Sequence, residues 1–121
     1  MEPPRRDLPE RTFLFARRVV DLCQTLDQTP GVSRTLANQL LRSGTSIGAN
    51  VEEDQASQSR ADFAAKYSIA CKEARETQYW LRLLAAAGLG VQADIESLTD
   101  EAGQLVAILT TIVKRTRNPA P

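Results

Sequence analysis

The sequence predicts an all-α protein that folds as an antiparallel up-down-up-down four-helix bundle. Apolar residues recur at helical spacing along almost the whole chain. No segment keeps the period-two alternation of a strand, and no Asn-Gly or Asp-Gly pair is present to close a hairpin. Short stretches rich in Pro, Gly and Ser separate four periodic segments of roughly 20 to 28 residues, which favours neighbouring helices that run in opposite directions.

The first predicted helix follows a charged, proline-rich segment, residues 1–9, which we expect to be a flexible arm. One apolar stripe runs along the helix at three- and four-residue spacing, and a second stripe lies beside it. The first stripe consists of Phe15, Val19, Leu22 and Leu26, and the second of Phe13, Ala16, Val20 and Cys23. The segment DQTPGVS, with its Pro-Gly pair, then ends the helix.

The second predicted helix runs from Ser33, a residue type that suits the N-cap, to the mid-fifties. It contains the segment RSGTSIGANVEED, in which Gly44 and Gly48 should together cost roughly 2 kcal/mol relative to alanine. A phosphate-binding loop is the alternative, but that motif needs a Lys-Ser or Lys-Thr pair after its glycines, and this chain has acids there.

We therefore predict an unbroken helix through the two glycines. Because Gly44 and Gly48 are four residues apart, they lie one above the other on the apolar stripe. Such a surface lets another helix approach closely, and this packing would offset the cost of the glycines. The expected partner is the bulky helix that carries Trp80.

The third and fourth helices have the clearest boundaries. Ser59 begins the third helix, with Asp62 three residues later as a weak capping box, and Gly88 suits its left-handed C-terminal end. Its expected buried face consists of Phe63, Tyr67, Ala70, Ala74, Leu81 and Leu84. The fourth helix has the heptad seam Val91, Ile95, Leu98, Ala102, Leu105, Leu109 and Ile112. The bundle domain is thus predicted over residues 10–117, with a C-terminal tail at 118–121.

Two carboxylates share a stripe of the third helix with its only tryptophan. Glu73 and Glu76 lie on the same side as Trp80, and Asn50 and Glu53 of the second helix could meet them. We favour a hydrogen-bonded network, buried or at an interface, that fixes helix register. Its expected members are Asn50, Glu53, Glu73, Arg75, Glu76, Tyr79 and Trp80, with Arg82 as a further candidate partner.

Two other interpretations of these carboxylates stay open. A charged face in solvent is the simplest one. A di-metal centre or an acid/base site built on Glu53, Glu73 and Glu76 is the other. Di-metal bundles normally take a Glu-x-x-His motif from each of two helices, and this chain contains no histidine, so we expect neither a metal nor another cofactor.

The composition is that of one soluble domain. The chain has 121 residues, of which 42% are hydrophobic and 25% charged. We expect a cytoplasmic protein without a membrane partner, since no segment reads as a signal peptide or a membrane span. The absence of histidine excludes Cys/His zinc sites and Ser/His or Cys/His nucleophile pairs within one chain. Cys23 and Cys71 are expected to be buried free thiols.

Positive charges gather at the two ends of a chain with no net charge. Lys plus Arg and Asp plus Glu number fifteen each, whereas nucleic-acid-binding proteins usually have a basic excess. The helix macrodipole accounts for part of the clustering at the C-terminus. Oligomerisation could still gather these cations into a ring that attracts phosphate. The candidate nucleic-acid contacts are Arg5, Arg6, Arg17, Arg18, Lys114, Arg115 and Arg117.

Several helices have more apolar surface than a single bundle needs. The first helix offers a second stripe through Phe13 and Val20, and the fourth adds Val106 and Val113 beside its seam. Because an extra apolar face on a soluble protein usually has a partner, we expect self-association.

Two segments in order, RSGTSIGANVEE and SRADFAAKYSIACKEARETQYWLRLL, resemble the four-helix bundle proteins of the 23S rRNA-intervening sequence family. The family pattern is a Ser-Ile-Gly-Ala-Asn core closed by a Glu, then a helix with Asp-Phe, Ser, Glu-Ala-x-Glu-Thr and Tyr-Trp-Leu. The first part is matched by Ser46, Ile47, Gly48, Ala49, Asn50 and Glu53. The second is matched by Asp62, Phe63, Ser68, Glu73, Ala74, Glu76, Thr77, Tyr79, Trp80 and Leu81.

The resemblance implies a homo-oligomer, typically a pentameric ring of bundles, without known enzymatic activity. It extends to the accessory variability determinant proteins of diversity-generating retroelements, strongly basic pentamers that bind nucleic acid and a reverse transcriptase. We therefore expect a non-enzymatic oligomeric scaffold that binds RNA or a nucleic-acid-handling protein. An enzyme that uses the carboxylate cluster and a protein–protein adaptor without nucleic acid are the alternatives.

Overall fold

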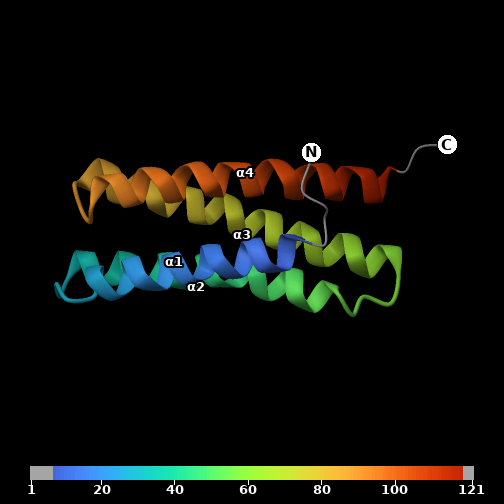
Figure 1. Cartoon of the computed structure of the whole chain (residues 1–121), viewed down its shortest axis with the longest axis horizontal. Coiled ribbons are helices and arrows are strands. Elements are labelled where there is room, and N and C mark those ends of the chain that lie inside the picture. Colours follow the sequence, from blue (N-terminus) through green and yellow to red (C-terminus); the bar gives the residue numbers. More distant parts are fainter. Residues whose placement is uncertain (1–6, 119–121) are drawn as a thin grey trace.

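Four antiparallel helices make up the computed structural model, which describes residues 7–118 (Figure 1). They are α1 (Leu8–Leu26), α2 (Val32–Asp54), α3 (Arg60–Ala87) and α4 (Gln92–Arg117). Each helix packs against the one before it, and α4 returns to α1, so α1 and α3 are diagonal to each other, as are α2 and α4. The predicted all-α, up-down-up-down bundle is confirmed.

Local sequence signals fixed some helix ends correctly. The Ser59 side chain accepts a hydrogen bond from the backbone N–H of Asp62 at 3.1 Å, and Gly88 ends α3 in the left-handed region at φ 70°. The predicted N-cap at Ser33 is wrong, because α2 begins at Val32 after Gly31, which has φ 95°. Ser33 instead lies buried inside the helix and its hydroxyl donates to the Leu26 carbonyl at 2.8 Å.

The first helix begins earlier than predicted. Leu8 is the first residue of α1 and is buried, so the expected arm over residues 1–9 extends too far. A proline near the start is compatible with this boundary, because the first-turn N–H groups have no partner inside a helix. Residues 1–6 of the predicted arm and 119–121 of the predicted tail lie outside the described residues.

The core consists of one apolar stripe from each helix. Phe15, Val19, Leu22 and Leu26 of α1 are buried, as are Ile95, Leu98, Ala102, Leu105, Leu109 and Ile112 of the α4 seam. Val91 was predicted as the first seam position, but it precedes α4 and is exposed. Cys23 and Cys71 are free and buried, as predicted. Burial, together with the nearby charge of Asp27, raises the pKa of the Cys23 thiol to about 12.

The helix α2 continues unbroken through Gly44 and Gly48, as predicted, but its partner there is α1 and not the Trp80 helix. A methyl group added at Gly44 would lie 2.9 Å from a Val19 methyl. One added at Gly48 would lie 3.2 Å from the Thr12 backbone carbonyl oxygen. The two glycines therefore allow the α1 backbone to lie against α2. Sequence periodicity placed them on the buried stripe but could not say which helix they face.

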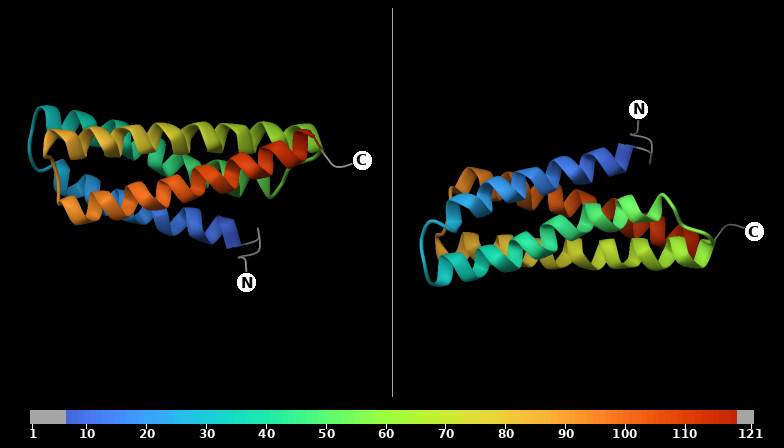
Figure 2. Two further views of the ribbon diagram at one scale, coloured as in Figure 1. Left: turned by 90° about the horizontal axis from the view of Figure 1, so that it is seen from above. Right: turned by 90° about the horizontal axis from the view of Figure 1, so that it is seen from below.

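The pair α1 and α4 packs least closely of the neighbouring pairs. Figure 2 shows α1 diverging from α4 toward the N-terminal end of α1. Arg11 bridges the two helices there: its Nε donates to Glu101 at 2.6 Å, and one terminal nitrogen donates to the other carboxylate oxygen at 2.9 Å. This bidentate hydrogen bonding raises the pKa of Arg11. No described helix has the length and apolar composition that a membrane span requires.

Candidate functional site

Three of the residues predicted for the polar network, Glu73, Glu76 and Trp80, meet Arg42 between α2 and α3. Arg42 of α2 reaches across to two carboxylates of α3, lying 3.4 Å from Glu73 and in contact with Glu76. The indole N–H of Trp80 donates to a carboxylate oxygen of Glu76 at 3.0 Å, and Arg42 contacts the same oxygen. The four side chains form one connected network, which we call the Arg42 network.

This network is half-buried. Glu73 and Glu76 expose 18% and 31% of their side chains, and Arg42 exposes 52%. A buried hydrogen bond links the same two helices: the hydroxyl of Thr77 on α3 donates to the hydroxyl of Ser43 on α2 at 2.9 Å, and both residues are fully buried. Ion pairs with this much solvent access contribute about 1 kcal/mol or less each, so their main effect is to fix how α3 is aligned on α2.

Several predicted members of the network lie elsewhere. Glu53 pairs with Lys66 at 3.3 Å, and the Asn50 amide donates to the carbonyl of Ser46 on its own helix at 2.8 Å. Arg75 is exposed on the α4 side of α3 and contacts neither glutamate. Tyr79 is exposed and packs edge-on against Trp80, with ring centroids 5.0 Å apart.

Arg42, the cation at the centre of the network, was not predicted. It shares one side of α2 with Ser46, Asn50 and Glu53, at spacings of four, four and three residues, and this pattern could have identified it. The three carboxylates proposed for an enzyme or metal site do not come together, because Glu53 pairs with Lys66. Within residues 7–118, no group of three or more potential ligand side chains is placed to hold a metal ion.

The predicted nucleic-acid contacts divide into engaged and free cations. Arg17 pairs with Asp21 at 3.2 Å, and Arg18 donates to the Ser97 hydroxyl at 2.6 Å. Arg117 donates to the Ser68 hydroxyl of α3 at 2.8 Å, whereas Lys114 and Arg115 are exposed without an ion pair in the described part of the chain. Arg5 and Arg6 lie outside the described residues.

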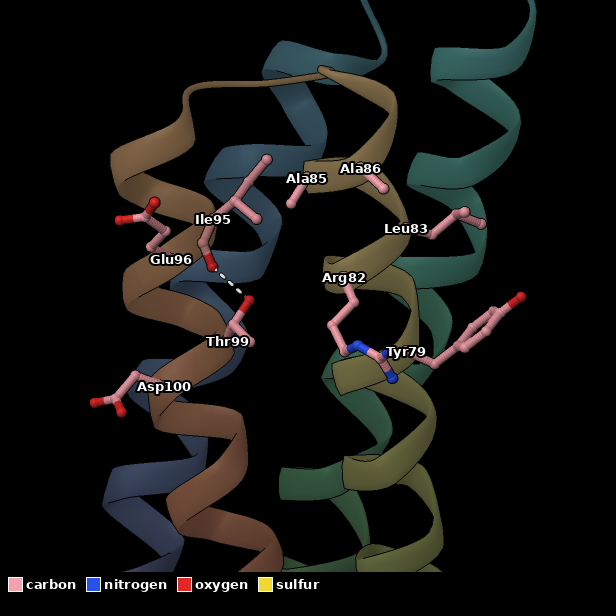
Figure 3. A pocket seen from close by; sticks show the side chains of 9 residues that line it. All are labelled: Tyr79, Arg82, Leu83, Ala85, Ala86, Ile95, Glu96, Thr99 and Asp100. Carbon is pink, nitrogen blue, oxygen red and sulfur yellow. Dashed lines mark hydrogen bonds between the residues drawn. The ribbon is translucent and has the colours of Figure 1, made fainter.

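A shallow pocket of about 670 Å³ lies between α3 and α4 near the loop that joins them (Figure 3). Ala85, Ala86 and Ile95 give it an apolar lining, and Arg82 extends from the α3 side. The Thr99 hydroxyl on its α4 side already donates to the Ile95 carbonyl at 2.7 Å. The pocket therefore presents apolar surface with charged margins and no hydroxyl paired with a base.

At the C-terminal end of α2, Asp54 is a buried carboxylate that the sequence did not single out. It exposes 3% of its surface, and one of its oxygens has no hydrogen-bond partner among the described residues. The other oxygen accepts from the Ser57 hydroxyl. Burial raises the pKa of Asp54, an effect that the Ser57 hydrogen bond and Lys66 oppose and the Asp62 charge supports.

Comparison with known proteins gives a family and a similar fold. The sequence profile of the 23S rRNA-intervening sequence proteins matches residues 7–111. Among solved structures, the chain is similar to a protein of unknown function from the S23 ribosomal protein family of Bacteroides thetaiotaomicron, with 41% identity and a TM-score of 0.80. That match covers 88% of this chain and 97% of the other. No curated protein matches it significantly.

Proposed function

This chain belongs to the 23S rRNA-intervening sequence protein family, and we propose that it acts as a self-associating scaffold and not as an enzyme. The proposed assembly is a ring of five identical bundles, as the resemblance to family members implies. Its first partner is therefore a second copy of the chain. We place the assembly in the cytoplasm, a reducing compartment that keeps Cys23 and Cys71 as free thiols.

The exposed apolar residues of α1 are the observation that carries this proposal. Phe13 and Leu14 expose 66% and 54% of their surface and project away from the core residue Phe15. Burying one such side chain contributes about 1.5–3 kcal/mol. Two adjacent ones on an otherwise charged helix face therefore favour a contact between subunits.

A second apolar surface lies on α3, the helix diagonal to α1. Ile69 exposes 46% of its surface, and the half-buried Trp80 lies on the same side of the helix, next to the Arg42 network. Because α1 and α3 are diagonal in the bundle, the two surfaces point in different directions. Contact between two different surfaces is head-to-tail, and head-to-tail contacts close into rings when the rotation between subunits allows it.

Replacing Phe13 and Leu14 together by serine tests the interface. We expect sedimentation velocity to show the wild type as an assembly and the double variant as a 13.3 kDa monomer with unchanged helical circular dichroism. Val32→Ser is the matched control, since Val32 is 68% exposed but lies at the start of α2, outside both surfaces. A double variant that sediments like the wild type would show that α1 is not the interface.

RNA binding is a second candidate role, favoured by the cations at the C-terminal end of α4. Lys114, Arg115 and Arg117 lie in the last turn of the helix. Five copies in a ring would attract phosphate better than one, although the macrodipole of α4 alone also favours cations there. Binding to structured RNA near 50 mM salt that weakens as salt is added would support this role, and binding that is absent or insensitive to salt would oppose it.

A further inference from the structure

The exposed ridge of α3 carries a row of cations interrupted by one aromatic residue. Lys72, Arg75, Tyr79 and Arg82 follow one another at spacings of three, four and three residues, so they share one side of the helix. All four are exposed. The row spans eleven residues of helix, so its first and last members lie about 15 Å apart along the axis. We call these four residues the α3 ridge.

The three cations of the α3 ridge have no acidic partner, whereas five other basic residues of the described chain do. Each of the cations Arg11, Arg17, Arg34, Arg42 and Lys66 lies within 4.0 Å of a carboxylate oxygen. Within residues 7–118, none of the three ridge cations has such a contact. Their charge is therefore available to an external anion.

Helix stability does not account for this row. The macrodipole favours cations only in the last turn of a helix, and the last turn of α3 contains none. Lys72 and Arg75 lie in the middle of α3, where two like charges three residues apart cost a few tenths of a kcal/mol. The opposite charge of Glu76, four residues after Lys72, offsets this cost, so the row adds little to the stability of the free helix.

Across the groove toward α4, further groups add to the anion-binding character of the α3 ridge. Lys72, Arg75 and Lys114 line a common cleft with the hydroxyls of Ser68 and Thr110. No carboxylate lines this cleft. Lys114 thus adds a third cation, from a different helix, to the two on α3.

Tyr79 supplies the aromatic member of the row. It exposes 52% of its surface, and the neighbouring Trp80 packs against it at an interplanar angle of 74°, which restrains its ring. Trp80 is itself held by its hydrogen bond to Glu76. An exposed and restrained ring between cations is the arrangement that proteins use to stack an unpaired base while neighbouring cations bind the phosphates.

We propose that the α3 ridge, together with Lys114, binds single-stranded nucleic acid. The cations bind backbone phosphates and Tyr79 stacks on an unpaired base. The site rests on the second candidate role proposed above, RNA binding, but adds residues of α3 to it and does not depend on the oligomeric state. It needs no sequence-specific contact, because every base has a stacking face.

The test is fluorescence anisotropy of labelled 15-nucleotide oligo-U and oligo-dT with the full-length protein between 50 and 200 mM salt. We expect the wild type to bind at 50 mM, and Lys72→Gln with Arg75→Gln to weaken binding on the order of ten-fold and to flatten the salt dependence. Tyr79→Ser should weaken binding without changing the salt dependence. Tighter binding of oligo-U than of oligo-dT would identify RNA as the natural ligand, and the reverse would identify DNA.

The matched control is Arg34→Gln with Lys66→Gln, which removes the same charge from two cations that have acidic partners. This control should bind like the wild type. The proposal that the α3 ridge is the binding site would be wrong if Lys72→Gln with Arg75→Gln bound as tightly as the wild type. It would also be wrong if this variant and the control were weakened equally. Either result would leave open that RNA binds elsewhere on the protein. Failure of the wild type to bind either oligonucleotide at 50 mM salt would reject the α3 ridge, whereas the experiment with structured RNA tests the RNA-binding role separately. Light scattering of each variant checks that the assembly is unchanged.

Discussion

At the residue scale, Gly44 of α2 faces Val19 of α1 and leaves no room for a side chain. Gly44→Ala gains roughly 1 kcal/mol of helix propensity, but its methyl group would lie 2.9 Å from a stiff, fully buried valine. Overpacking of this kind costs about 1–3 kcal/mol. We therefore expect Gly44→Ala to lower the free energy of unfolding, as measured by urea denaturation.

Two controls separate packing from propensity. In a Val19→Ala background the two contacting methyl groups are gone and only the Cβ atom, 3.3 Å from the added methyl group, remains, so Gly44→Ala should cost less there than in the wild type. Gly103→Ala in α4 meets only the end of the flexible Gln78 side chain, so it should be neutral or stabilising. Destabilisation by Gly44→Ala of the same size in both backgrounds would contradict the packing explanation.

Asp54 gives stability a pH dependence of known sign. Burial raises the pKa of Asp54 in the folded protein above its value of about 4 in the unfolded chain. At a pH between these two pKa values, the native state therefore binds more protons than the unfolded state. The contribution of Asp54 to stability is therefore most favourable at low pH and declines as the pH rises through the folded pKa. Asp54→Asn removes this decline.

Urea denaturation of wild type and Asp54→Asn at pH 4 and pH 7 measures the effect. The variant should gain stability relative to the wild type on going from pH 4 to pH 7. Other carboxylates titrate in both proteins, so the difference isolates Asp54. A difference that stays constant with pH, or changes in the opposite direction, would mean that the Asp54 carboxylate is not desolvated in the native state.

At the element scale, the packing of α1 on α4 depends on the bidentate ion pair of Arg11 with Glu101, because these two helices pack less closely than the other neighbouring pairs. Arg11 and Glu101 expose 26% and 21% of their side chains, so their interaction is less screened than a surface pair. A double-mutant cycle with Arg11→Gln and Glu101→Gln should give a coupling energy above about 1 kcal/mol.

The exposed pair Arg17–Asp21 within α1 is the control for that cycle. Its side chains are 71% and 56% exposed, and pairs of this kind contribute about 0.3–0.5 kcal/mol. Equal coupling energies for the two pairs would indicate that the Arg11–Glu101 ion pair does little to hold α1 against α4.

The sequence predicted features that lie within one helix better than contacts between helices. The α4 seam from Ile95 to Ile112, the Ser59 cap and the Gly88 end depend on residues within one helix, and the sequence predicted all three. The position of Ser33 depends on its hydrogen bond to Leu26 across a loop, and the Arg42 network depends on how α2 and α3 are aligned. Both are contacts between elements, which periodicity along one helix does not contain.

At the scale of the whole molecule, the bundle separates its surfaces by chemistry. The apolar residues Phe13 and Leu14 lie on α1, the Arg42 network lies between α2 and α3, and the α3 ridge borders α4. Sequence periodicity identified Phe13 as a surplus apolar residue of α1, but it missed Leu14 and placed the buried Cys23 on the same outer stripe. It missed the α3 ridge, because Arg75 was assigned to the glutamate network and periodicity does not show which cations of residues 7–118 have an acidic partner.

The most direct test of the scaffold proposal is the native mass of the full-length protein, measured by light scattering after size exclusion across a ten-fold range of concentration. We expect one species with the mass of five 13.3 kDa chains, stable to dilution, because the apolar surfaces of α1 and α3 would then be buried between subunits. A species of 13.3 kDa at every concentration would contradict self-association and leave Phe13 and Leu14 exposed on a monomer.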